Sequence, residues 1–87
     1  MNYTIVLSKT AEEHLAAVWN AAADRNTVTV AMDEIERRLG RDPRGFGESR
    51  AGKDRLIFHG PLAVYYRVDQ ARREVRILSI GSAGRST

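Results

Sequence analysis

Arginine is the residue type with the most chemical potential in this chain. Lys and Arg together number 14 against 11 Asp and Glu, and only Lys9 and Lys53 are lysines. The planar guanidinium of arginine matches a phosphate or a carboxylate, so the composition favours a nucleic acid or an acidic protein segment as partner. The net charge is only +3, and a solvated basic surface is the alternative interpretation.

Few residues are available for metal or cofactor chemistry. The chain has no cysteine, and its two histidines, His14 and His59, are too few for a zinc site. The run 45–52 (GFGESRAG) lacks the spacing and the following helix of a phosphate-binding loop. His59 is expected to be exposed and structural, with no carboxylate or serine nearby to form a pair with it. We therefore predict neither a metal nor a cofactor.

Arg55, Arg67 and Arg76 lie on three consecutive runs in the C-terminal part of the chain. Each run is short, rich in β-branched or aromatic residues, and bounded by turn residues, which predicts an antiparallel meander. The runs are 53–59 (KDRLIFH), 62–68 (LAVYYRV) and 74–80 (EVRILSI).

The turns between the runs set the register and therefore the two faces of the sheet. The Gly60-Pro61 break places Ile57 opposite Val64, and the second break places Val68 opposite Val75. One predicted face carries Arg55, Ile57, His59, Leu62, Val64, Tyr66, Val68, Val75, Ile77 and Ser79. The other carries Asp54, Leu56, Phe58, Ala63, Tyr65, Arg67, Arg76, Leu78 and Ile80. Because both faces are apolar, we expect helices on one and a partner on the other.

The same register places Arg67 directly opposite Arg76, and like charges in that position are destabilising. Asp54, on the neighbouring run 53–59, also lies opposite Arg67 and is expected to form an ion pair with it. Arg76 then lies in solvent or binds a carboxylate or phosphate of a partner. Of the two adjacent tyrosines, Tyr66 is expected in the core and Tyr65 at the partner surface.

The N-terminal half is predicted to contribute one strand and one helical hairpin. Residues 2–7 alternate as a strand, and Ser8 or Thr10 caps a helix that runs to about Asp24. Its apolar stripe is Ala11, Leu15, Val18, Trp19 and Ala22, with Trp19 as the expected core anchor.

A second predicted helix begins with a cap at Thr27 or Thr29 and ends at Gly40. Its apolar face is Val28, Ala31, Ile35 and Leu39. The two helices form an αα-hairpin that covers one sheet face. The segment 42–52 is predicted as an irregular loop.

The chain of 87 residues is expected to form one domain over 1–87, with a frayed tail at 82–87. No run is long and apolar enough for a membrane span, and no signal layout is present at the N-terminus, so we expect a cytoplasmic protein. The predicted fold class is α+β, a β-α-α-β-β-β domain with two helices on one face of a four-stranded, mainly antiparallel sheet.

This order of elements resembles the RelE/ParE superfamily of type II toxin-antitoxin toxins over nearly the whole chain. The residues that carry the resemblance are Ala11, Glu12 and Leu15 in the first helix, Asp42-Pro43 and Gly47-Glu48-Ser49 in the loop, Arg55, Tyr65-Tyr66-Arg67-Val68-Asp69, and Val75-Arg76-Ile77-Leu78. The resemblance implies a growth-inhibiting, plasmid-stabilising toxin that a cognate antitoxin neutralises. It implies one of two targets, messenger RNA cleaved on the ribosome or DNA gyrase.

The ribonuclease branch needs a basic cluster with a Tyr or His to move a proton from the ribose hydroxyl. Ala63 stands where that branch typically places an arginine, and the run 82–85 lacks its Lys-Arg pair. The resemblance therefore favours gyrase-type inhibition or another target, so we do not expect an enzyme. An mRNA endoribonuclease and a non-toxic interaction module are the alternatives.

These considerations select two sets of candidate residues. The catalytic candidates are Arg55, Arg67, Arg76 and Tyr65. The predicted partner-binding residues are Leu56, Phe58, Tyr65, Arg67, Arg76, Leu78 and Ile80. The expected partner is an antitoxin segment, with a homodimer through the same face as the alternative, and no membrane is involved.

Overall fold

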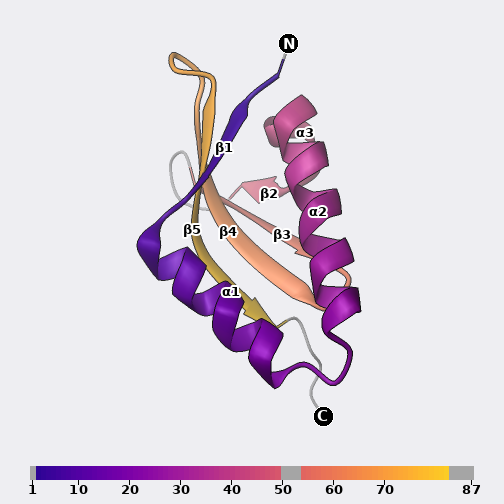
Figure 1. Cartoon of the computed structure of the whole chain (residues 1–87). Coiled ribbons are helices and arrows are strands. Elements are labelled where there is room, and N and C mark those ends of the chain that lie inside the picture. The colour runs from indigo at the N-terminus through magenta and orange to yellow at the C-terminus, as the bar shows by residue number, and fades with distance from the viewer. Residues whose placement is uncertain (1, 50–53, 83–87) are drawn as a thin grey trace.

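The computed structural model describes residues 2–49 and 54–82, which form one sheet with helices on one of its faces (Figure 1). In chain order the elements are β1 (Thr4–Leu7), α1 (Lys9–Ala21), α2 (Arg25–Arg41), α3 (Pro43–Phe46), β2 (Glu48–Ser49), β3 (Asp54–His59), β4 (Leu62–Asp69) and β5 (Glu74–Ser82). The predicted α+β class and its order of one strand, two long helices and a three-strand meander are confirmed.

The strands lie in the order β1-β5-β4-β3-β2. β1 pairs with β5 in parallel, and the other neighbours are antiparallel. Ile57 lies opposite Val64 and Val68 opposite Val75, as the turn positions predict. The four predicted strands are therefore present, and the two-residue β2 extends the sheet at the β3 edge.

The segment predicted as an irregular loop contains local structure. The Asp42 carboxylate accepts the backbone N–H of Gly45 at 3.1 Å, and Pro43 opens α3, so a short helical turn forms. Residues 50–53 of this segment lie outside the described residues, as do residues 83–87 of the predicted tail. Ser82, assigned to that tail, belongs to β5.

The two long helices begin at side-chain caps. Ser8 Oγ accepts the N–H of Ala11 at 3.0 Å and starts α1. The predicted cap of α2 at Thr27 or Thr29 is wrong, because Asp24 accepts the N–H groups of Asn26 and Thr27 at 3.0 and 3.3 Å. Helix α1 ends at Ala21 rather than at about Asp24, because Asp24 is the N-cap of α2.

The core lies between the helices and the inner face of the sheet. Helix α2 buries the four predicted positions and also Met32. Along β4, buried side chains alternate with more exposed ones, so only one face of the sheet is covered. The buried strand residues are Ile57, Leu62, Val64, Tyr66, Val68, Val75, Ile77 and Ile80.

Trp19 is not the core anchor that its size predicts, since 40% of its surface is exposed. It lies beside the stripe of α1 that faces the sheet and spans the gap to α2 instead. Its indole N–H donates to Thr29 Oγ1 at 3.2 Å, and the Arg25 guanidinium lies 4.6 Å from the centre of its ring. Trp19 therefore joins the two helices at the surface.

A β-bulge in β5 changes the predicted faces of the sheet. Tyr66 lies opposite Ile77 but Tyr65 lies opposite Ser79, so Leu78 is one extra residue in β5. After the bulge, side chains exchange faces. Ile80 is 5% exposed and lies in the core, while Ser79 shares the face of Tyr65. The prediction that Ile80 lies on the partner-binding face is therefore wrong.

The bulge predicts which residues near the end of β5 stabilise the fold. Ile80→Ala should lower the free energy of unfolding by about 2 to 5 kcal/mol, because it leaves a cavity in the core. Leu78→Ala, at the half-buried bulge position, should cost less. Urea denaturation of both variants measures the difference, and a larger loss for Leu78→Ala would contradict the bulged register.

Candidate functional site

The face of the sheet opposite the helices is the candidate site, and we call it the open face. Among the described residues, the strand registers place on this face Asp54, Leu56, Phe58, Ala63, Tyr65, Arg67, Asp69, Glu74, Arg76 and Ser79 of β3, β4 and β5, together with Thr4 and Val6 of β1. Phe58 is 58% exposed, more than Trp19 or Val30, the other exposed large apolar side chains of the described residues. The open face therefore combines apolar surface with two arginines.

Asp54 binds two of the other site residues. Arg67 Nε donates to Asp54 Oδ1 at 2.6 Å, and the Tyr65 hydroxyl donates to Asp54 Oδ2 at 2.9 Å. The hydrogen bond from Arg67, followed by that from Tyr65, lowers the pKa of Asp54. The predicted ion pair between Asp54 and Arg67 is thus present.

Arg76 lies directly opposite Arg67 in the β4–β5 ladder, as the register predicts. The side chains of Arg67 and Arg76 are 53% and 48% exposed. Arg76 Nη2 lies 3.4 Å from Glu74 Oε1, a long contact between neighbours on one strand that the sequence analysis missed. Arg67 and Arg76 therefore extend from neighbouring strands on the open face, Arg67 paired with Asp54 of β3 and Arg76 in contact with Glu74 of β5.

The fourth catalytic candidate, Arg55, lies apart from the other three. Its Nη2 donates to the backbone oxygens of Arg44 at 2.7 Å and Gly47 at 2.6 Å, which holds α3 and the following residue against the sheet. Nearby, the buried Tyr66 hydroxyl donates to Pro43 O at 2.8 Å, and burial raises the pKa of Tyr66. Arg55 and Tyr66 therefore secure the segment around α3 rather than join the open face.

A Cβ atom at Gly47 would collide with the Tyr66 hydroxyl, so this position requires glycine. In the sequence, Gly47 stands out only as part of the family resemblance. Its physical reason is the close approach of the chain to a buried tyrosine.

His59 has the carboxylate partner that the sequence analysis did not find. Its Nε2 lies 2.7 Å from Oε1 of Glu34 on α2, and this hydrogen bond lowers the pKa of Glu34. The two residues are 25 positions apart in the chain, and only the packing of α2 on the end of β3 brings them together. The pair links helix and sheet on the side away from the open face.

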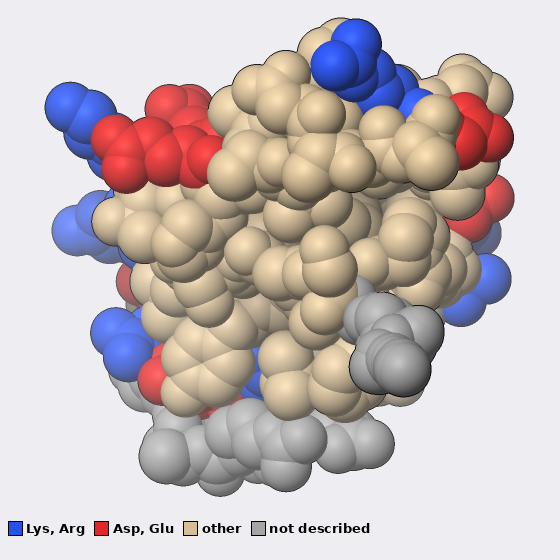
Figure 2. Space-filling model, turned by 90° about the horizontal axis from the view of Figure 1, so that it is seen from below, with Lys and Arg blue, Asp and Glu red and all other residues tan. Residues whose placement is uncertain are grey.

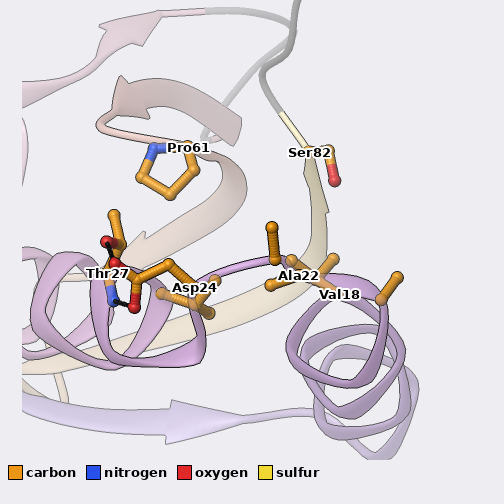
Figure 3. A pocket seen from close by; sticks show the side chains of 9 residues that line it. Val18, Ala22, Asp24, Thr27, Pro61 and Ser82 are labelled. Atoms are coloured by element: carbon orange, nitrogen blue, oxygen red, sulfur yellow. Dashed lines mark hydrogen bonds between the residues drawn. The ribbon is translucent and has the colours of Figure 1, made fainter.

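A hollow of about 340 Å³ lies at the end of the molecule where α1 meets α2 (Figure 3). It is lined by Val18, Ala22, Thr27, Pro61 and Ser82, with Asp24 at its margin. Figure 2 shows this end of the molecule, where charged side chains lie mainly at the edges of the view. Because the Asp24 carboxylate caps α2, the hollow offers apolar contact rather than a reactive group.

Residues 2–49 and 54–82 contain no group of three side chains able to hold a metal ion. Within the same ranges, no helix is both long and apolar enough to cross a membrane.

The chain is similar in structure to several solved proteins. No family model and no curated protein sequence matches the chain. The toxin-antitoxin complex RelBE2 from Mycobacterium tuberculosis contains a chain with a TM-score of 0.77 and 21% identity, over 94% of this chain and 99% of that one. The ParDE toxin-antitoxin system of Pseudomonas aeruginosa gives 0.71 and 17%, over 94% and 97%.

A third similar structure is TrmO from Pseudomonas aeruginosa, with a TM-score of 0.63 and 18% identity. The match covers 92% of this chain but only 35% of TrmO. The chain therefore has the fold of the RelE and ParE toxins, and the resemblance found in the sequence is confirmed at that level. The same fold also forms part of a larger protein.

The lowered pKa values of Asp54 and Glu34 predict a loss of stability in acid. Each carboxylate stabilises the fold above its ordinary pKa, 3.8 for Asp54 and 4.5 for Glu34, and this contribution disappears as the pH falls through the folded value. The free energy of unfolding should therefore decrease between about pH 5 and pH 1.

Asp54→Asn should make this decrease shallower, because the variant has no proton to take up at that position. Urea denaturation at a series of pH values measures the slope. Glu13→Gln, at an exposed position of α1, is the control and should keep the wild-type slope. Equal slopes for wild type and Asp54→Asn would contradict the assignment.

Proposed function

We propose that this protein is the toxin component of a type II toxin-antitoxin system and that its open face binds a segment of the cognate antitoxin. The observation that carries the proposal is an uncovered sheet face with exposed Phe58 toward one end and two arginines toward the other. Support comes from the similar structures, which are described as a toxin-antitoxin complex and a toxin-antitoxin system.

The chemistry of the open face indicates what kind of segment it would bind. Leu56, Phe58 and Tyr65, with the half-buried Leu78 at the bulge, would contact apolar side chains. Arg67 and Arg76 would donate hydrogen bonds to acidic residues of the same segment. A segment of this kind is disordered alone and folds on docking, so that apolar burial offsets the entropy of ordering. Ile80 has no part in this interface, because it is buried.

The proposed toxin acts in the cytoplasm, inhibits growth and stabilises the plasmid that carries it. Gyrase-type inhibition or another target is favoured over RNA cleavage for two reasons. Arg55 is bound to backbone oxygens of the α3 segment, away from Arg67 and Arg76. Ala63 gives the open face no further cation. These positions do not supply the cluster that stabilises a cleaved phosphate.

A non-toxic interaction module is the second candidate. The observation in its favour is the match to TrmO, in which this fold covers about a third of a longer chain, 35% of its length. A fold alone does not determine activity.

The binding surface can be tested with two exposed apolar positions on opposite sides of the molecule. Phe58→Asp should abolish binding of the antitoxin segment, and Tyr65→Ala should weaken it by about 1 to 3 kcal/mol, as expected for a central anchor. Val30→Asp on α2, where Val30 is 45% exposed, is the matched control and should bind normally. Isothermal titration calorimetry with the product of the neighbouring gene measures all three.

Sedimentation of the protein alone and growth after induction complete this test. A mass that rises with concentration, and that Phe58→Asp returns to the monomer, would show that the face closes a homodimer instead. Induction should arrest growth, and co-expression of the neighbouring gene should restore it for wild type but not for Phe58→Asp. Normal growth after induction of the wild-type protein would support the non-toxic module.

The purified protein is expected not to cleave messenger RNA on the ribosome at rates typical of the nuclease branch. The physical reason is the separation of Arg55 from the two arginines of the open face. Primer extension on ribosome-bound messenger RNA measures cleavage. Cleavage that disappears in Arg67→Ala or Arg76→Ala would contradict this expectation and establish the ribonuclease.

A further inference from the structure

We propose that Arg67 and Arg76 form a binding site for a single carboxylate on the open face, and that Asp54 and Tyr65 are positioning residues that orient Arg67 toward it. The inference deepens the proposed function and rests on it for the source of the ligand, which is an acidic side chain of the antitoxin segment. The site itself follows from the bonds and the register of four described residues.

The hydrogen bonds of Asp54 fix the direction in which Arg67 can bind. Asp54 accepts from Nε of Arg67, so this bond leaves the terminal nitrogens Nη1 and Nη2 to another acceptor. Both carboxylate oxygens of Asp54 are used, one by Arg67 and one by Tyr65, and its side chain is only 13% exposed. Asp54 is therefore a fixed support for Arg67 rather than a counter-ion that a ligand displaces.

The register places the second arginine directly across from Arg67. Arg67 and Arg76 are direct partners across β4 and β5, which puts their Cβ atoms about 4.5 to 5.5 Å apart. Like charges on directly opposite residues are destabilising, and an anion bound by both guanidinium groups replaces this repulsion with two attractive contacts. The contact of Arg76 with Glu74 is long at 3.4 Å and uses one nitrogen, so it leaves donors available.

The charge balance favours a carboxylate of a peptide over a nucleic acid. The two arginines are accompanied by Asp54 and Glu74, and these four charges sum to zero. A nucleic acid is bound largely through excess positive charge and counterion release, which this arrangement does not provide. Recognition here depends on oriented N–H groups, and a planar carboxylate suits them.

The site can be observed directly with nitrogen-15-labelled full-length protein and an oligoglutamate peptide as the probe. Titration should shift the Nε–Hε NMR signals of Arg67 and Arg76 together and to saturation. The signal of Arg72, on the β4–β5 turn, is the internal control and should shift little. An absence of saturable shifts, or equal shifts at Arg72, would overturn the proposal. Saturation by inorganic phosphate but not by the peptide would overturn the assignment of a carboxylate ligand.

Conservative variants separate oriented donors from simple charge. Arg67→Lys keeps the charge but loses the fork, and should weaken peptide binding about tenfold to hundredfold. Arg76→Lys should do the same, while the control Arg72→Lys should leave binding unchanged. Wild-type affinity in Arg67→Lys would show that only charge matters and would overturn the site.

The positioning role of Asp54 has its own readout. In the wild-type protein the Nε–Hε proton of Arg67 should exchange slowly with water because Asp54 accepts it. In Asp54→Asn it should exchange faster and peptide affinity should fall, with the Arg76 signal in place to show that the fold is kept. Tyr65→Phe should give a smaller effect of the same sign. Unchanged exchange and affinity in Asp54→Asn would overturn the positioning role.

Failure of this inference and failure of the proposed function are distinguishable. If the antitoxin binds Arg67→Lys as tightly as wild type, the carboxylate site is wrong while the toxin-antitoxin assignment stands. If induction leaves growth unaffected while the peptide still saturates both arginines, the site stands and the toxin assignment fails.

Discussion

The bulge at Leu78 is the constraint on which the rest of the structure depends. It lets β5 remain in the sheet between β1 and β4 while Ile80 points into the core. Two side chains of the α1 region satisfy the backbone at this place. Ser8 Oγ donates to Leu78 O at 3.2 Å, and His14 Nδ1 accepts the N–H of Ile80 at 3.3 Å. The bulge therefore fixes both the core and the position of α1 over β5.

The two faces of the sheet follow from that arrangement and use adjacent tyrosines in opposite ways. Tyr66 is buried and donates to Pro43 O, which holds the α3 segment in place with the help of Arg55. Tyr65 points to the open face and donates to Asp54. Because side chains alternate along a strand, one residue step separates a structural tyrosine from one at the surface. The same alternation separates Arg55 from Arg67.

The similarity to toxin structures concerns the fold, whereas function depends on the residues at the surface. The open face has exposed apolar side chains and two arginines whose charges are balanced by Asp54 and Glu74. This balance favours a partner that offers both apolar groups and a well-placed carboxylate. It disfavours a chemistry that needs concentrated positive charge, such as stabilisation of a cleaved phosphate.

Local pattern determined most of the fold, because turn residues, alternation and helical spacing act over a few residues. The meander, the register before the bulge, the α2 stripe and the Asp54–Arg67 pair could all be predicted in this way. The face of Ile80, the exposure of Trp19 and the His59–Glu34 contact were decided by the tertiary structure. No local sequence pattern marks the position of the bulge in β5. The contact between Glu34 and His59 forms only when α2 packs on β3. Sequence periodicity specifies what each element presents, whereas packing between distant elements decides which side chains meet.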